Sequence, residues 1–194
     1  MSELFSIQLQ NRQQQGRDGV WLDLPTTTEQ VQAALRQIGI SSDNPQGLFI
    51  SGYFAEEEKR FAIPYNMVLA SNVDELNFLA SRLETLSTGE RAELNAALQA
   101  PQSELFSIGR ITDFPENVDY YVHLPDVRGP AQLGDYYLNR SGMVDMPEEW
   151  KGGIDTAQFG RYVAQQEQGV FTEYGYLVSY THLRAHETKA NLVC

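Results

Sequence analysis

The spacing of apolar residues changes its period several times along this chain, which limits the fold to small mixed units. Apolar and polar residues alternate in residues 5–9 and again in residues 20–24, which predicts two half-buried strands paired as a hairpin. Residues 31–38 instead place apolar side chains at i, i+3, i+4 and i+7, the pattern of an amphipathic helix. An apolar strand follows at residues 47–54, so the first segment, residues 1–61, is predicted to be a β-β-α-β domain.

Residues 62–112 change to a helical period. Leucines recur at spacings of three and four across residues 76–86, and Ser71 is placed to cap this helix at its N-terminus. A capping box at residues 87–90 predicts the start of a second helix, and residues 104–111 predict a third. This segment is therefore predicted to be a small helical bundle domain.

Residues 113–179 return to a mixed pattern. Residues 120–124 alternate as a strand, and Pro130 is placed to open a helix. Asp155 is placed to cap a further helix, and residues 170–178 predict one long aromatic-rich strand. The fold class that follows is α+β, with three small domains: the β-β-α-β domain, the helical bundle and a C-terminal α+β domain.

Residues 180–194 differ from the rest, because the run reverses the acidic trend and has no clear period. We expect this segment to be a tail that is non-native or disordered. His182 and His186 are four residues apart and could share a helical face, but two histidines without further nearby ligands do not make a metal site. We therefore expect no metal.

Acidic residues predominate after the first segment. Between Phe61 and Ser179 the chain carries 17 Asp and Glu against 7 Lys and Arg, and its formal net charge is −12. Contacts to phosphates need clustered lysine and arginine, so direct binding to nucleic acid or to an anionic membrane is disfavoured. A negative field favours a positive partner, and the most positive surfaces in a cell are those that hold nucleic acid. Acidity that serves only solubility is the plain alternative.

The chain lacks the sequence signatures of common enzymes, so we expect neither catalytic activity nor a cofactor. It contains no glycine-rich phosphate-binding pattern, no G-x-S-x-G elbow and no H-E-x-x-H pair. His123 lies among tyrosines on a predicted strand, where a structural or surface role is expected. A carboxylate pair acting as in glycoside hydrolases stays open, because separation in space defines it rather than separation in sequence.

The start of the chain and its cysteine content indicate a compartment. Residues 1–5 lack the basic region and long apolar stretch of a secretory signal, and no apolar run approaches the length of a membrane span. The one cysteine, Cys194, excludes an internal disulfide framework and fits a reducing environment. We expect a cytoplasmic protein.

Three motifs occur in order along the chain. The first is GVWLDLP at residues 19–25, and the second is NVDELN at residues 72–77. The third runs from GDYY at residues 134–137 through FGR at residues 159–161 to the strand at residues 170–177. Together they resemble the ArdA-type antirestriction proteins carried by conjugative plasmids and transposons.

This resemblance implies a protein that imitates DNA. Members of the family are elongated, with three small domains in line, and pair into a curved dimer whose carboxylates follow the path of duplex phosphates. They occupy the DNA-binding groove of type I restriction-modification enzymes and so protect an incoming mobile element. On this basis we expect a homodimer whose partner is a DNA-binding defence enzyme. Inhibition of another DNA-targeting system, such as a CRISPR effector, is the alternative, and a carboxylate-pair hydrolase is a less favoured one.

Duplex DNA presents one charge per about 1.7 Å of axis, so the 26 carboxylates would match roughly 44 Å of duplex if all faced outward. We expect fifteen of them to stand in for phosphates: Glu56, Glu57, Glu58, Asp74, Glu75, Glu84, Asp113, Glu116, Asp119, Asp126, Asp135, Asp145, Glu148, Glu149 and Asp155. Each is equally open to interpretation as an ordinary solvated carboxylate. Asp74 and Asp155 have the further alternative of capping a helix.

Overall fold

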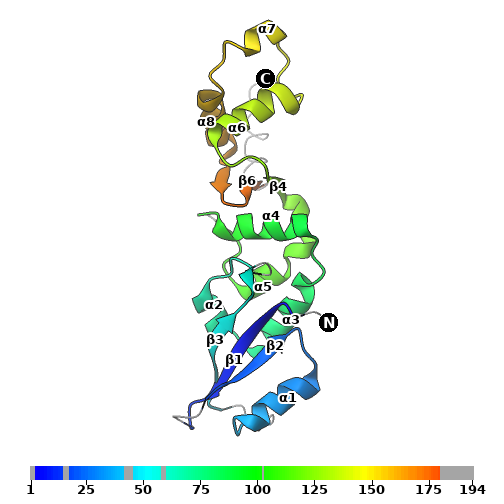
Figure 1. Ribbon diagram of the computed structural model, residues 1–194, viewed down its shortest axis with the longest axis vertical. Helices are drawn as coiled ribbons and strands as arrows, with labels where there is room; N and C mark the ends of the chain where they lie inside the picture. Colours follow the sequence, from blue (N-terminus) through cyan, green and yellow to red (C-terminus); the bar gives the residue numbers. More distant parts are fainter. Residues whose placement is uncertain (1–2, 15–17, 42–45, 58–59, 102, 180–194) are drawn as a thin grey trace, which may run out of the picture. The chain divides into compact units, whose positions relative to one another are not determined.

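The computed structural model describes residues 3–14, 18–41, 46–57, 60–101 and 103–179. These residues have the predicted α+β class, with helices and two three-stranded antiparallel sheets (Figure 1). The predicted tail and its two histidines lie outside the described residues.

The chain folds into two compact units. Met1–Ser87 and Glu104–Pro115 form the first, whereas Thr88–Ser103 and Glu116–Cys194 form the second. Residues of the predicted helical bundle, 62–112, therefore occur in both units. The division into three domains in line stays a prediction.

The sheet of the first unit has the strand order β2-β1-β3. Its strands are β1 (Phe5–Asn11), β2 (Val20–Leu24) and β3 (Leu48–Phe54). β1 pairs antiparallel with β2, with Ile7 opposite Leu22, which confirms the predicted hairpin. The register between β1 and β3 shifts between Gln8 and Leu9, which marks a β-bulge. Phe5, Ile7 and Leu9 are fully buried, so one face of this sheet forms the core.

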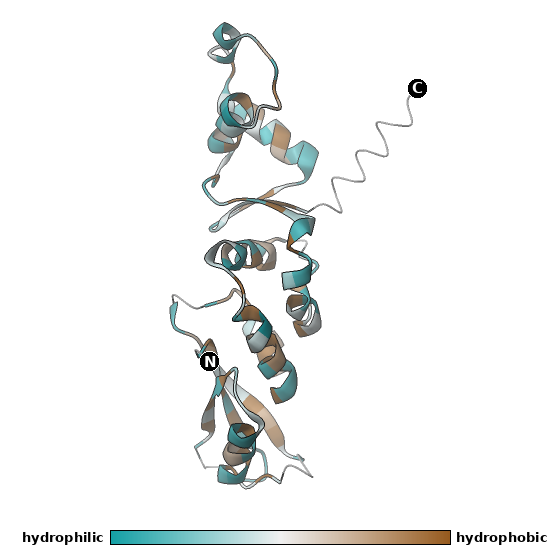
Figure 2. Ribbon diagram, turned by 90° about the vertical axis from the view of Figure 1, so that its right-hand side faces the viewer, coloured by the Kyte–Doolittle hydropathy of each residue, from teal (hydrophilic) through white to brown (hydrophobic). Residues whose placement is uncertain are grey.

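Helix α1 (Thr28–Gln37) follows β2, and its two ends have clear sequence causes. Thr27 and Gln30 form a capping box, in which the hydroxyl of Thr27 accepts from the Gln30 amide and the Gln30 side chain accepts from the Thr27 amide. The helix stops just before Gly39, whose φ of +69° favours glycine. In Figure 2 this helix, the lowest one, carries both teal and brown turns, as expected of an amphipathic helix.

The first unit also contains α2 (Tyr65–Leu69), α3 (Val73–Leu83) and α5 (Ile108–Thr112). The predicted N-cap of α3, Ser71, is wrong. Its hydroxyl still reaches the preceding helix, where it donates to the carbonyl oxygen of Met67 at 2.8 Å. Asn72 caps α3 instead, accepting from the Glu75 amide at 2.8 Å. The third predicted helix begins later than expected, at Ile108.

The side chain of Asn77 ties α3 to the segment after β2. It accepts from the backbone amide of Thr26 at 2.7 Å and donates to the carbonyl oxygen of the same residue at 3.0 Å. The neighbouring Leu76 and Leu79 are fully buried. The helix is therefore held both by apolar packing and by a two-bond polar contact.

The sheet of the second unit has the strand order β4-β6-β5. Its strands are β4 (Tyr121–Leu124), β5 (Val170–Thr172) and β6 (Gly175–Ser179), and α4 (Thr88–Gln99) packs against β4 and β6. The single long strand predicted for residues 170–178 is wrong, because the chain reverses before Gly175, whose φ is +131°. His123 has a structural contact with this turn, its Nε2 lying 2.9 Å from the carbonyl oxygen of Tyr174.

The helical elements of the second unit are a 3₁₀ turn (Val118–Tyr120), α6 (Pro130–Asp135), a π turn (Tyr136–Arg140), α7 (Glu148–Lys151) and α8 (Thr156–Glu167). Another 3₁₀ turn (Phe114–Glu116) precedes them.

Helices α6 and α8 cross with their backbones in contact. A Cβ at Gly134 would lie 1.9 Å from the carbonyl oxygen of Thr156, and one at Gly160 would lie 1.8 Å from that of Pro130. Only glycine fits at these two positions, which both belong to the third motif quoted above.

Candidate partner-binding surface

The structure distributes the candidate phosphate surrogates over both units. Glu58 lies outside the described residues. The first unit carries Glu56, Glu57, Asp74, Glu75, Glu84 and Asp113. The second unit carries Glu116, Asp119, Asp126, Asp135, Asp145, Glu148, Glu149 and Asp155.

Most of these acids are open to solvent. Eleven of the fourteen described residues are exposed, and only Glu75, Glu84 and Asp135 are partly buried. Exposure is what contact with a partner requires, but ordinary solvated carboxylates share it. Their assignment as phosphate surrogates therefore stays a prediction.

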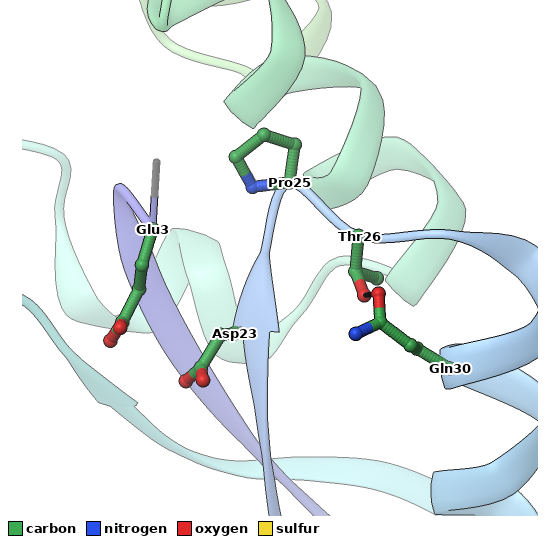
Figure 3. A pocket seen from close by; sticks show the side chains of 5 residues that line it. All are labelled: Glu3, Asp23, Pro25, Thr26 and Gln30. Carbon is green, nitrogen blue, oxygen red and sulfur yellow. Dashed lines mark hydrogen bonds between the residues drawn. The ribbon is translucent and has the colours of Figure 1, made fainter. Parts of the chain in front are cut away.

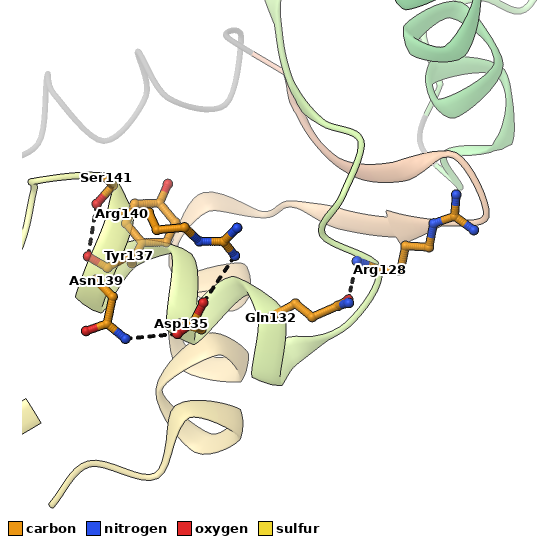
Figure 4. A network of polar contacts seen from close by, with 7 residues as sticks. All are labelled: Arg128, Gln132, Asp135, Tyr137, Asn139, Arg140 and Ser141. Carbon is orange, nitrogen blue, oxygen red and sulfur yellow. Dashed lines mark hydrogen bonds and ion pairs between the residues drawn. The ribbon is translucent and has the colours of Figure 1, made fainter. Parts of the chain in front are cut away.

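Asp135 and Glu148 are candidates that form an ion pair with a basic side chain of their own unit. Asp135 lies 3.2 Å from the Arg140 guanidinium and accepts from Asn139, as Figure 4 shows. Glu148 lies 2.9 Å from the Lys151 ammonium. Such exposed ion pairs are weak, about 0–1 kcal/mol, so a more positive partner can compete for these carboxylates.

The two candidates with a capping alternative differ. Asp155 does cap α8, because its carboxylate accepts from the backbone amide of Gln158 at 2.9 Å. Asp74 does not cap α3, since Asn72 holds that position. Asp74 and Glu75 instead lie in the first turn of the helix, where the helix dipole stabilises negative charge.

Glu90 and Glu93, which lie one turn apart on α4, were not among the predicted phosphate surrogates. Burial, followed by the charges of Glu90 and Asp119, raises the pKa of Glu93 to about 7. Its Oε1 is enclosed and has no hydrogen-bond partner among the described residues. The i, i+3 spacing was visible in the sequence, but the approach of Asp119 depends on the fold.

Glu167 is an acid with a structural role. Its carboxylate accepts from the hydroxyl of Tyr137 and, at 2.8 Å, from that of Tyr176. Burial and this carboxylate raise the pKa of both tyrosines, so their protons stay in place. Tyr176 belongs to the core of the second unit, and Glu167 is therefore held inward rather than offered to a partner.

Several arginines lie over aromatic rings of their own unit. The guanidinium carbon is 5.2 Å from the ring centre in the pair of Arg12 and Phe49, and 4.9 Å in the pair of Arg110 and Phe106. Arg140 lies 5.7 Å from the Tyr136 ring. These distances are within the range of cation–π contacts.

The described residues contain neither a candidate metal site nor a candidate membrane span. No group of three or more His, Cys, Asp or Glu side chains among them is arranged to hold a metal ion. Within the same ranges, no helix has the length and apolar character that crossing a bilayer requires.

The comparison with protein families gives one result. The model of the family described as antirestriction protein (ArdA) matches residues 15–178. That range includes the three motifs and both glycines of the α6–α8 crossing. A comparison with curated proteins found no match. Because the matched range covers most of the chain, the protein belongs to the ArdA family of antirestriction proteins, and counteracting restriction is the function that this membership assigns to it.

Proposed function

We propose that this protein inhibits a type I restriction-modification enzyme by occupying its DNA-binding groove, with carboxylates in the place of phosphates. The supporting observation is that eleven acids, spread over both units, are exposed. A groove that holds duplex DNA is lined with lysine and arginine, so such a surface is complementary to it.

Inhibition of this kind is competitive and needs no chemical step. The protein's field steers the encounter, which raises the association rate at low ionic strength. Binding to the groove then excludes the duplex for as long as the complex persists. The protein acts in the cytoplasm in this proposal, where a restriction enzyme would meet the incoming DNA of a mobile element.

A homodimer extends the same mechanism. The chain offers 26 carboxylates and 14 cationic side chains, so one copy replaces the charge of only a short duplex. Two copies double the number of acids available to one groove. Measuring the mass of the complex with the enzyme by light scattering tests this part of the proposal, and a complex that contains a single chain refutes it.

The central experiment is displacement of DNA. A purified type I methyltransferase is loaded with a fluorescently labelled duplex that contains its target sequence, and the protein is added while anisotropy is recorded. We expect stoichiometric release of the duplex at low salt and weaker inhibition as salt rises, because the contacts are between charges. Retention of the duplex by several enzymes of this class would refute the target, and the same assay on a CRISPR effector would then test the alternative.

Charge reversal tests whether position matters as well as net charge. The variant Asp145→Lys/Glu149→Lys reverses two exposed candidates of the second unit. Asp18→Lys/Glu104→Lys is the matched control, because it makes the same change in net charge at exposed acids outside the candidate set. We expect a greater loss of displacement in the first variant, with both folded as judged by circular dichroism. Equal losses would indicate a general field effect rather than an ordered array.

A further inference from the structure

The first sheet has an outer face that differs from its core face. Side chains alternate along β1, so Ser6 and Gln8 lie opposite the buried Phe5, Ile7 and Leu9. Ser6 pairs with Asp23 on one side and Phe54 on the other, and Gln8 pairs with Trp21 and Gly52. On this outer face, Asp23, Ser6 and Phe54 therefore lie side by side across the three strands. Trp21, Gln8 and Gly52 form the neighbouring row.

The indole of Trp21 lies across the sheet. A Cβ at Gly52, two strands away, would be 3.1 Å from Cη2 of this indole and 3.2 Å from Cβ of Gln8. The ring thus extends over β1 as far as β3, and it has room to do so because residue 52 is glycine. Trp21 remains 49% exposed, so much of its ring surface is open to a ligand.

Two carboxylates of this face share one proton donor. The hydroxyl of Ser6 lies 2.8 Å from Oδ1 of Asp23 and 3.2 Å from Oε1 of Glu3, and a hydroxyl has a single proton to donate. Ser6 is buried, but both acids are exposed. In the part of the chain that the structure describes, neither carboxylate forms an ion pair with a lysine or an arginine. The pair carries negative charge that a cation would compensate.

The same carboxylates border a hollow of about 370 Å³. Its other walls are Pro25, Thr26 and Gln30, and Figure 3 shows Glu3 and Asp23 pointing in a common direction from neighbouring segments. The hydroxyl of Thr26 donates to Oε1 of Gln30 at 2.6 Å, so this wall is polar and already ordered. The hollow leaves room for a cationic group at the carboxylates, while Trp21, which is not one of its walls, lies beside Asp23 on the outer face of the sheet.

We propose that this outer face binds an arginine side chain of the partner protein, with the guanidinium held by Asp23 and Glu3 and stacked on Trp21. This inference rests on the proposed function and deepens it by naming a recognition site. Arginine fits better than lysine, because its planar guanidinium forms paired bonds to carboxylates and stacks on aromatic rings. Repulsion from two carboxylates disfavours phosphate ligands.

The arrangement also suits imitation of DNA. An arginine in a groove that binds duplex DNA meets phosphates, and here it would meet a carboxylate in the place of a phosphate. The indole adds a stacking surface that a duplex does not offer, because its base faces are covered by their neighbours. Trp21 and Asp23 are two residues apart on one strand, so their side chains lie on the same face about 7 Å apart. Arg12 and Arg110 show within this chain that guanidinium groups lie over its aromatic rings.

The test uses short peptides as probes of the intact protein. Fluorescein-labelled peptides with four arginines or four lysines, alternating with glycine, are titrated at low salt while anisotropy is recorded. We expect the arginine peptide to bind about three- to tenfold more tightly. Trp21→Leu, which keeps apolar cover over Gly52, and Asp23→Asn, which keeps an acceptor for Ser6, should each abolish most of that preference.

Two variants serve as matched controls. Phe78→Leu replaces another exposed aromatic residue of the same unit, and Asp18→Asn removes the same charge from the same hairpin. Both should keep the arginine preference. Equal affinity for the two peptides, or an equal loss in Asp18→Asn and Asp23→Asn, would overturn the inference in favour of general charge attraction.

The displacement assay separates this inference from the proposed function. If the unsubstituted protein releases the duplex and Trp21→Leu does so equally well, the site is refuted and DNA mimicry stands. If the arginine preference is present but no methyltransferase loses its duplex, the site stands and the proposed target is refuted. The expected result is release by the unsubstituted protein with at least a fivefold higher midpoint for Trp21→Leu.

Discussion

Replacing Glu93 by glutamine should stabilise the protein at neutral and alkaline pH, and much less at pH 5. The Glu93 side chain is half-buried on α4, with one carboxylate oxygen enclosed and unpaired among the described residues. Burial and the charges of Glu90 and Asp119 raise its pKa from 4.5 to about 7. Glutamine has nearly the same shape and no charge, so it removes the cost of ionising this position.

The sign follows from proton binding. Between pH 4.5 and about 7 the folded protein retains a proton that the unfolded chain has released. The free energy of unfolding therefore falls as pH rises through that window, and the whole penalty is present above it. The pKa shift corresponds to at most about 3 kcal/mol. Because the side chain is half-exposed, solvent screening reduces this to roughly 1–2 kcal/mol.

Urea-induced unfolding, followed by circular dichroism at pH 5 and pH 8, measures the effect. Glu93→Gln should have a higher unfolding midpoint than the unsubstituted protein at pH 8 and a much smaller gain at pH 5, where most of the penalty is still absent. Glu104→Gln, at an exposed acid, is the control and should change neither. A gain of equal size at both pH values, or a loss at pH 8, would refute the raised pKa of Glu93.

Three further tests concern packing and hydrogen bonds. Gly160→Ala should lower the free energy of unfolding by about 2 kcal/mol or more, because the added Cβ would overlap a backbone carbonyl. Gly109→Ala, whose Cβ would meet nothing within 4 Å, should raise the melting temperature slightly. Similar melting curves for the two variants would contradict the close contact of α6 and α8. Asn77→Ala removes two backbone contacts and should lower the free energy of unfolding in urea by about 1–3 kcal/mol; no change would show that water replaces them. Tyr176→Phe should lower the free energy of unfolding, measured by calorimetry, by about 1.5–3 kcal/mol, because Glu167 loses a charge-assisted hydrogen bond. Adding Glu167→Gln to this variant should recover part of the loss. No change in Tyr176→Phe would contradict a stabilising role for this hydrogen bond.

The elements of the fold that depend on local patterns could be predicted from the sequence. Alternation gave β1 and β2, and the position of Asp155 gave the start of α8. The predicted strand at residues 170–178 failed because its apolar pattern continues through a turn, and Gly175 was the only local sign of the reversal. The choice of Asn72 over Ser71 as a cap depended on where the preceding helix ends, which no local pattern fixes.

The candidate surface was predictable only in part. Acids in loops and in first turns of helices, such as Asp126 and Asp74, could be predicted to be exposed, because such segments lie at the protein surface. The environment of Glu93 could not be predicted, since it depends on an acid from a distant turn. The same holds for Glu3 and Asp23, which are 20 positions apart in sequence and meet through Ser6.

The two arginines that lie over Phe49 and Phe106 have a consequence for potency. A guanidinium held over a ring of its own chain reaches fewer neighbouring carboxylates than one on a freely rotating side chain. Truncating either ring would free a positive charge to fold back onto nearby acids, although the net charge of −12 would not change. Replacing Phe49 or Phe106 by a small neutral residue should thus weaken binding to a positive partner, because the released arginine would pair with acids of its own chain.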